Sequence, residues 1–200
     1  MTDQKTLDVY TAKAAEYAGL SGNEGPDQDL RDFMTLLPAG GRVLDLGCGP
    51  ANASVNMRNA GFDPDPIDVS LGMVTLANDT HDIGARLGTF DDITGTAIYD
   101  GIWANFSLLH APREDLPRYL TALTDALRPD GIFHIGMKTG TGAKRDTIDR
   151  LYTYVTTDEL NGLLTEAGLT IIDTRTGETT GLDGVVAPFV IMRARKDQDA

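Results

Sequence analysis

A glycine-rich turn flanked by two aspartates is the first candidate for chemistry in this sequence. The run Val43–Asn52 is typical of an apolar strand that passes into a turn with Gly47 and Gly49 and then into a helix. Glycine has no Cβ, so such a turn bends sharply and lets a ligand lie against its backbone. Asp45 precedes the first glycine by two residues, and Asp68 follows it by 21 residues, at the end of the next short strand. A carboxylate in that second position accepts hydrogen bonds from both ribose hydroxyls of an adenosine.

The charges beside this turn distinguish between two classes of cofactor. A nicotinamide or flavin dinucleotide places its pyrophosphate at the start of the following helix, where the Asp45 carboxylate would repel it. The third glycine of the dinucleotide pattern is also missing, because position 52 is Asn52. S-adenosylmethionine (SAM) has no phosphate, and a carboxylate attracts its ammonium and its sulfonium. The sequence therefore favours SAM, and a dinucleotide oxidoreductase stays open as an alternative.

Four segments, in the expected order, resemble motifs of the class I SAM-dependent methyltransferases. Asp45–Gly49 resembles the first motif, Ile67–Ser70 the acidic ribose-binding step, Tyr99–Trp103 the fourth strand, and Leu127–Gly131 the turn before the fifth strand. The resemblance covers about residues 40–195 and is nearest to the small bacterial type 11/12, tellurite-resistance-like domains. It implies an α/β fold of three layers, Rossmann-like, with a mostly parallel seven-stranded sheet and one antiparallel strand.

Carried over residue by residue, the resemblance implies the contacts with SAM. The glycine turn would line the methionine part, Asp68 would bind the ribose, and an acid from segment 90–92 would accept a hydrogen bond from the adenine amino group. Asn105 would border the sulfonium, and Tyr17 of an N-terminal helix would close over the cofactor. The expected cofactor-binding residues are Tyr17, Asp45, Gly47, Cys48, Gly49, Asp68, Val69, Phe90, Asp91, Asp92, Asn105 and Phe106.

The second strand departs from the family pattern. The segment Gly61–Pro66 places prolines and acids where an apolar strand is usual. This departure shortens the expected strand, and it leaves open whether Asp63, Asp65 or Asp68 is the ribose ligand.

The methyl acceptor is expected beyond the carboxyl ends of strands four and five, where ligands of open parallel sheets bind. The segment that begins at Lys138 also contains Lys144, Arg145 and Arg150, a concentration of positive charge in an acidic chain. Such a cluster is suited to a carboxylate or another anion, and a solvated loop paired with nearby aspartates is the alternative. The candidate acceptor-binding residues are Lys138, Arg150, Tyr152 and Tyr154.

His110 is the candidate catalytic residue. Its imidazole has an ordinary pKa near neutrality, which suits a general base. The alternative is a histidine that only orients its loop. Methyl transfer from a sulfonium depends mainly on proximity and in-line alignment, so a thiol or amine acceptor could react without a base.

Strand-length apolar runs alternate with helical patterns, which is typical of a parallel sheet with crossover helices. Leu116, Leu120, Leu123 and Leu127 are expected on one face of a helix, which Arg128–Gly131 ends before the next strand. Thr156 starts a later helix with a capping box. Two N-terminal helices are expected over about 7–18 and 27–37. The expected strands are Arg42–Leu46, Pro66–Val69, Ala85–Leu87, Ile98–Ala104, Ile132–Lys138, Leu169–Arg175 and Phe189–Arg195, the last two as an antiparallel hairpin that starts near Pro188.

Composition limits the class of protein. The chain has 200 residues, of which 41% are hydrophobic, enough for one domain: residues 1–200, with an N-terminal helical cap at 1–38 and a core at 40–195. It shows no membrane-length apolar run and no secretory signal, and its single cysteine, Cys48, fits a reducing compartment, so we expect a cytoplasmic protein. Its three histidines show no metal-ligand spacing, so no metal site is expected.

The net charge of −13 limits the partners. Binding to nucleic acid or to an anionic membrane needs a surplus of Lys and Arg. The sequence therefore predicts a small-molecule methyl acceptor, no nucleic acid, no membrane, and a monomer or homodimer. A protein that binds SAM or its product S-adenosylhomocysteine (SAH) without catalysis remains the alternative from another class.

Overall fold

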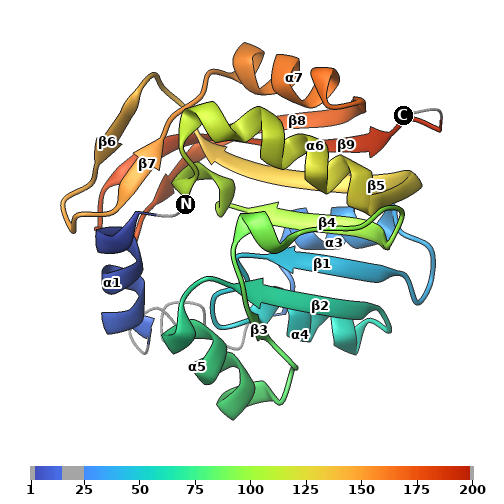
Figure 1. Cartoon of the computed structure of the whole chain (residues 1–200), viewed down its shortest axis with the longest axis horizontal. Coiled ribbons are helices and arrows are strands. Elements are labelled where there is room, and N and C mark those ends of the chain that lie inside the picture. The colour runs from blue at the N-terminus through green and yellow to red at the C-terminus, as the bar shows by residue number, and fades with distance from the viewer. Residues whose placement is uncertain (1–2, 15–24, 199–200) are drawn as a thin grey trace.

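The computed structural model describes residues 3–14 and 25–198. Its main sheet has seven strands in the order β3-β2-β1-β4-β5-β9-β8 (Figure 1). The strands of this sheet are β1 Arg42–Leu46, β2 Asp63–Asp68, β3 Arg86–Leu87, β4 Tyr99–Asn105, β5 Leu127–Lys138, β8 Leu169–Thr180 and β9 Val186–Lys196. A second, two-stranded sheet pairs β6 (Ala143–Arg145) with β7 (Leu151–Thr153).

The sheet is parallel except at β9, which runs antiparallel to both β5 and β8. The expected mostly parallel sheet with one reversed strand is confirmed. The hairpin is longer than the sequence predicted, because β9 already begins at Val186 and includes Pro188. The ladder of β9 with β5 ends at Phe189, and just beyond it the carbonyl of Pro188 accepts from Thr139 N at 3.0 Å, so the missing N–H of Pro188 falls where this ladder stops.

Strand β2 is also longer than predicted, since it starts at Asp63 and contains Pro64 and Pro66. These prolines pair with β1 on one side, whereas the short β3 reaches only Ile67 and Asp68 on the other. The prolines therefore have one open edge, and the strand keeps its ladder with β1.

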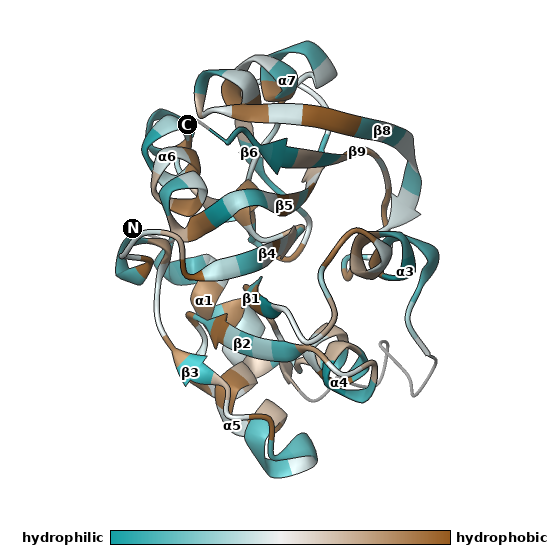
Figure 2. Ribbon diagram, turned by 90° about the vertical axis from the view of Figure 1, so that its right-hand side faces the viewer, coloured by the Kyte–Doolittle hydropathy of each residue, from teal (hydrophilic) through white to brown (hydrophobic). Residues whose placement is uncertain are grey.

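Helices cover both faces of the sheet, and Figure 2 shows α6 on the opposite side from α3 and α4. The largest core lies under α6 and α7, and it buries all four leucines of the predicted stripe. The predicted helix is one residue too long, because α6 ends at Ala126, and β5 begins at Leu127 and includes the predicted turn Arg128–Gly131. The predicted capping box of Thr156 is present at the start of α7. The helices are α1 Gln4–Ala12, α3 Gln28–Thr35, α4 Asn52–Asn59, α5 Leu71–His81, α6 Leu116–Ala126 and α7 Thr157–Glu166.

Helix α1 lies across the carboxyl ends of the strands, beside the β6–β7 sheet (Figure 1). Arg145 binds both carboxylate oxygens of Asp3 at 2.8 Å, and the backbone N–H of Leu151 donates to Thr6 Oγ1 at 2.9 Å. Both contacts join α1 to a segment more than 140 residues away in the chain. The division into a cap and a core stays a prediction. Among the described helices, none has the length and apolar character that a membrane span requires.

Candidate functional site

A cavity opens at the carboxyl ends of β1, β2 and β4, underneath α1, whose residues Thr6, Leu7 and Tyr10 line it. No lysine or arginine occurs among the described residues that line it, so it offers no cation to a pyrophosphate. The lining residues are Thr6, Leu7, Tyr10, Leu46, Gly47, Gly49, Ile67, Asp68, Val69, Ser70, Met73, Gly88, Thr89, Phe90, Asn105, Phe106, Ser107 and His110.

The glycine turn forms one wall of the cavity. The N–H groups of Gly47 and Cys48 both donate to the carbonyl of Ile67, at 2.8 and 3.0 Å, and so tie the turn to β2. Gly47 has a φ of +73°, and a Cβ added there would lie 2.5 Å from Ser107 Cβ. The turn and the loop after β4 therefore approach each other as closely as they do only because position 47 is glycine.

Replacing Gly47 with alanine is expected to destabilise the fold by about 2–3 kcal/mol and to weaken cofactor binding, because strain at positive φ adds to overpacking. Gly84→Ala is a matched control: Gly84 has the same φ of +73° but no neighbour within 4 Å of an added Cβ. Urea unfolding of both variants measures the difference. Equal losses of stability would show that the contact with Ser107 is unimportant.

Asp68 is the acid that reaches the cavity. Its Oδ1 accepts from Ser70 N at 2.8 Å and its Oδ2 from Gly49 N at 2.9 Å, which fixes the carboxylate between β2 and the glycine turn. Burial raises its pKa above the ordinary value, and the two backbone hydrogen bonds oppose that shift. A carboxylate has about four lone-pair sites, so this one can also accept hydrogen bonds from ribose hydroxyls.

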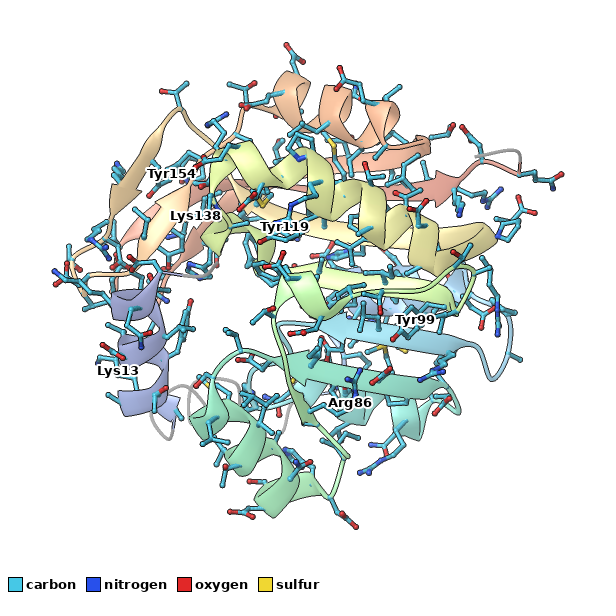
Figure 3. The ribbon with its side chains drawn as sticks, viewed as in Figure 1. Lys13, Arg86, Tyr99, Tyr119, Lys138 and Tyr154 are labelled. Atoms are coloured by element: carbon cyan, nitrogen blue, oxygen red, sulfur yellow. The ribbon has the colours of Figure 1, made fainter. Side chains whose placement is uncertain are left out.

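The other two candidates for the ribose ligand, Asp63 and Asp65, do not line the cavity. Burial alone would raise the pKa of Asp65, but hydrogen bonds from Arg86 and Tyr99 outweigh it and the pKa is lowered. Figure 3 labels Arg86 and Tyr99 on the side of the sheet far from α1. Asp63 is exposed at the start of β2. The positions of Asp63 and Asp65 therefore favour Asp68 as the ribose ligand, and this role of Asp68 remains a prediction.

Asp45 and Cys48 lie behind the glycine turn and do not line the cavity. Asp45 accepts a hydrogen bond from Ser54 Oγ at 2.7 Å, and burial raises its pKa to about 7. Burial and the nearby carboxylates raise the pKa of the Cys48 thiol, which makes it a poor nucleophile. Their contacts with the cofactor stay predictions, with Asp45 acting through its charge and Cys48 through the backbone of the turn.

Segment 90–92 sends one side chain of three to the cavity. Phe90 lines it, whereas Asp91 accepts from Arg118 Nη1 at 2.6 Å and from Tyr119 Oη at 3.2 Å. Asp92 accepts from the N–H and the hydroxyl of Thr89, in a capping box that closes this short turn. An adenine contact by either carboxylate remains a prediction, and neither is among the residues that line the cavity.

The end of β4 supplies the opposite wall, with Asn105, Phe106 and Ser107. The hydroxyl of Ser107 is buried and has no hydrogen-bond partner in the described part of the chain. An unsatisfied buried polar atom beside a cavity is expected where a ligand completes the hydrogen bond. Ser107 begins the segment Ser107–Arg113, where an acceptor is expected after strand four, but no pattern in the sequence marks Ser107 itself as a ligand contact. Tyr17 lies outside the described residues.

His110 reaches the cavity with a defined tautomer. Its Nδ1 lies 2.9 Å from the carbonyl oxygen of Leu151, which can only accept, so Nδ1 carries the proton. Its Nε2 lies 2.8 Å from Tyr10 Oη and accepts the tyrosine proton. Burial lowers the pKa of His110 to about 4, so the ring is neutral at pH 7.

The predicted acceptor cluster lies just outside the cavity. The Arg150 side chain is 3% exposed and bonds to Asp146 Oδ2 through Nε at 2.8 Å, while its Nη1 donates to Tyr10 Oη at 3.1 Å. Lys138 Nζ lies 4.2 Å from the ring centroid of Tyr152. Figure 3 shows Lys138 and Tyr154 close together above α1. None of the four predicted residues lines the cavity, and their role stays a prediction.

The fold, the glycine turn and the carboxylate at the end of β2 define a class I SAM-dependent methyltransferase, and the residues present fit its cofactor. The cavity is lined by the carboxylate of Asp68, the aromatic ring of Phe90 and Ser107, whose buried hydroxyl has no hydrogen-bond partner in the described part of the chain. The sequence model of the methyltransferase domain family matches residues 23–174. This chain belongs to that family, whose methyl donor is SAM.

Two relatives by sequence show the same likeness. An uncharacterized methyltransferase of Staphylococcus carnosus is 30% identical over 134 residues, 62% of this chain and 64% of its own length. The N-terminal Xaa-Pro-Lys N-methyltransferase 2 of Danio rerio is 27% identical over 184 residues, 86% of this chain and 65% of its own length. The chain thus spans just under two thirds of these relatives.

A solved structure shares the fold. The 1,6-didemethyltoxoflavin-N1-methyltransferase of Burkholderia thailandensis, bound to 1,6-didemethyltoxoflavin and SAH, superposes with a TM-score of 0.73 at 22% identity. The superposition covers 96% of this chain and 88% of that chain.

Proposed function

We propose that this chain transfers the methyl group of SAM to a small-molecule acceptor by in-line displacement. The observation that supports the proposal is that one cavity has a wall suited to the cofactor and another wall suited to an acceptor. Gly47, Gly49 and Asp68 form the wall suited to the cofactor, and Ser107 and His110 lie on the wall suited to an acceptor.

The work of the chain in this reaction is binding, orientation and exclusion of water. Asp68 would hold the ribose, the backbone of the glycine turn the methionine part, and Phe90 the adenine. Bound SAM supplies an electrophilic methyl group. Alignment of two reactants in a closed site is the main source of rate in such a displacement, and α1 closes this one from above.

Two features favour a small acceptor: helix α1, which covers the cavity, and the negative net charge of the chain. Helix α1 lies over the cavity, held by Asp3 and Thr6, which leaves little room for a macromolecule. The net charge of −13 disfavours a nucleic acid. The Burkholderia thailandensis enzyme described above is named for the small molecule 1,6-didemethyltoxoflavin, whereas the Danio rerio enzyme is named for an N-terminal Xaa-Pro-Lys sequence. The position of helix α1 over the cavity favours a small-molecule acceptor. We place the activity in the cytoplasm, in a monomer or homodimer.

An anionic group on the acceptor is supported by Lys138. The residue is 7% exposed, and no described side chain accepts a hydrogen bond from its ammonium. Burial lowers its pKa, with Asp183 opposing the shift. Arg150, by contrast, is already engaged by Asp146 and Tyr10. Among the described residues, Lys138 is therefore the buried cation of the predicted cluster that has no carboxylate partner within ion-pair distance.

Lys138→Gln is expected to remove a preference for anionic ligands. The SAH-loaded wild type should bind benzoate at least about tenfold more tightly than neutral benzamide, the worth of one charge-assisted hydrogen bond. Calorimetry with both probes measures this ratio, and Lys144→Gln on the exposed strand β6 is the control. A wild type that binds both probes equally would contradict an anionic acceptor.

The first test of the proposed function is calorimetric titration of the wild type with SAH and, separately, with NAD. Micromolar binding of SAH without binding of NAD is expected. The absence of SAH binding would remove the basis for an enzyme. Binding without turnover of any acceptor in a panel of thiols, phenols, amines and carboxylates would favour the SAM-binding protein without catalysis.

A further inference from the structure

A network of hydrogen bonds reaches the wall of the cavity and joins residues that are far apart in the sequence. Tyr10 Oη lies 2.8 Å from His110 Nε2, a contact between residues 100 positions apart, and the two rings meet edge to face at 5.3 Å. Arg150 Nη1 lies 3.1 Å from the same Tyr10 oxygen. Tyr10 and His110 both line the cavity, while Arg150 stands behind them.

The groups at the two ends of this hydrogen-bond network determine which atom donates in each of its hydrogen bonds. The carbonyl of Leu151 can only accept, so His110 donates through Nδ1 and accepts through Nε2. The Arg150 guanidinium can only donate, so the oxygen of Tyr10 accepts from it. The hydroxyl proton of Tyr10 is therefore directed at His110 Nε2, and a neutral imidazole stands ready to receive it.

We propose that Tyr10 and His110 form a proton-accepting pair for the methyl acceptor, whose reacting atom is a neutral O–H or N–H. This inference rests on the proposed function. As the bond from the acceptor atom to the methyl carbon forms, the carbon–sulfur bond breaks and its electron pair stays on sulfur. The acceptor proton passes to Tyr10 Oη, and the tyrosine proton passes to His110 Nε2. The imidazolium later releases its proton to water.

The charges around the Tyr10–His110 pair favour proton uptake by His110 as the methyl group is transferred. His110 is surrounded by Tyr10 on α1, Tyr152 on β7, Lys138 at the end of β5, and the Asp146–Arg150 pair between β6 and β7. A sulfonium in the same cavity adds a third cation to Lys138 and Arg150 and disfavours an imidazolium. Methyl transfer removes that positive charge, so His110 becomes more basic when the acceptor must lose its proton.

A purely structural role for the Tyr10–His110 bond is the alternative. Such a bond would only fasten α1 over the cavity. Asp3 and Thr6 already fasten the helix to Arg145 and Leu151. Neither of these contacts uses a titratable group that lines the cavity. A fastening role predicts that Tyr10→Phe loosens α1 and lowers turnover equally for acceptors with and without a proton at the reacting atom.

The test that needs no acceptor is nuclear magnetic resonance of the imidazole nitrogens. The chain has three histidines, so the His110 signals are assigned with the variant His110→Gln. We expect the Nδ1–H tautomer, and a His110 pKa about one unit higher in the SAH complex than in the SAM complex, as for loss of a nearby charge. Tyr10→Phe should raise that pKa in both complexes. Tyr99→Phe, with a hydroxyl bound to Asp65, is the control.

Turnover supplies the second arm, with probes that carry the carboxylate discussed above. The probes 4-hydroxybenzoate and 4-aminobenzoate have a proton to lose at the reacting atom, and 4-(dimethylamino)benzoate has none. Tyr10→Phe and His110→Gln should lower turnover of the first two by about 10²–10⁴-fold while SAH still binds. Preferential methylation of 4-(dimethylamino)benzoate, or identical His110 titration in the SAM and SAH complexes, would overturn the pair. Failure of SAH to bind the wild type would instead overturn the proposed function itself.

Discussion

Asp68→Ala is expected to weaken SAH binding by about 100-fold, because the variant would lose the two charge-assisted hydrogen bonds that we propose Asp68 makes to the ribose hydroxyls. The same carboxylate also accepts from Gly49 N and Ser70 N, so its removal frees the glycine turn from the end of β2. Both effects act on the wall of the cavity that is suited to the cofactor. Calorimetric titration with SAH at pH 7 measures the loss.

Asp63→Ala is the matched control for this experiment, because Asp63 belongs to the same strand and is exposed outside the cavity. Its affinity for SAH should equal that of the wild type. Thermal unfolding of both variants separates a lost contact from a lost fold. Unchanged SAH affinity in a folded Asp68→Ala variant would refute the assignment of the ribose ligand.

Asp146→Ala is expected to destabilise the fold by about 3–5 kcal/mol, since it leaves the charge of Arg150 buried without its partner. The two side chains are 5% and 3% exposed, and Asp146 Oδ1 also accepts from the backbone N–H of Arg150 at 2.9 Å. Urea unfolding at pH 7 measures the loss. Asp32→Ala removes a half-exposed partner of Arg193 and should cost less than about 1 kcal/mol. Similar losses in the two variants would show that the Asp146–Arg150 pair is no more important than a surface pair.

The stabilisation by Asp146 should depend on pH in a defined direction. Burial alone would raise its pKa, but the hydrogen bonds from Arg150 outweigh burial and lower it. A carboxyl group whose pKa is lower in the folded state stabilises the fold above its unfolded pKa, about 3.9. The difference between wild type and Asp146→Ala should therefore be constant from pH 7 to about 5 and shrink as the pH falls below about 4. A difference that grows with acidity would contradict the ion pair.

Local sequence was sufficient for the elements and for the cofactor wall. The stripe of Leu116, Leu120 and Leu123, the capping box at Thr156 and the glycine turn each depend on residues within a dozen positions, so pattern and backbone chemistry determine them. The glycine turn and Asp68 end adjacent parallel strands, and such ends meet at one edge of a sheet. Their position at one cavity therefore followed from the order of the strands.

The strand bounds and the orientation of single side chains needed tertiary contacts. Pro64, Pro66 and Pro188 lie within strands because a missing N–H is tolerated where the ladder to a neighbouring strand stops, which depends on how far that strand reaches. Asp91 bonds to Arg118 and Tyr119 on α6, outside the described lining of the cavity, although the sequence places it beside Phe90.

The residues of the proposed acceptor site show most clearly what the sequence determines and what only the tertiary structure decides. Sequence alone determined that His110 and a basic segment follow strands four and five. Only the folded chain decided that Asp146 neutralises Arg150, that Lys138 keeps an unpaired ammonium among the described side chains, and that Tyr10 of α1 donates to His110. For Tyr10 and His110 the physical reason is distance along the chain: residues 100 positions apart meet through packing, and no local pattern encodes which polar groups they will find. Asp146 and Arg150 are only four positions apart, and what the fold decided there is that their pair is buried.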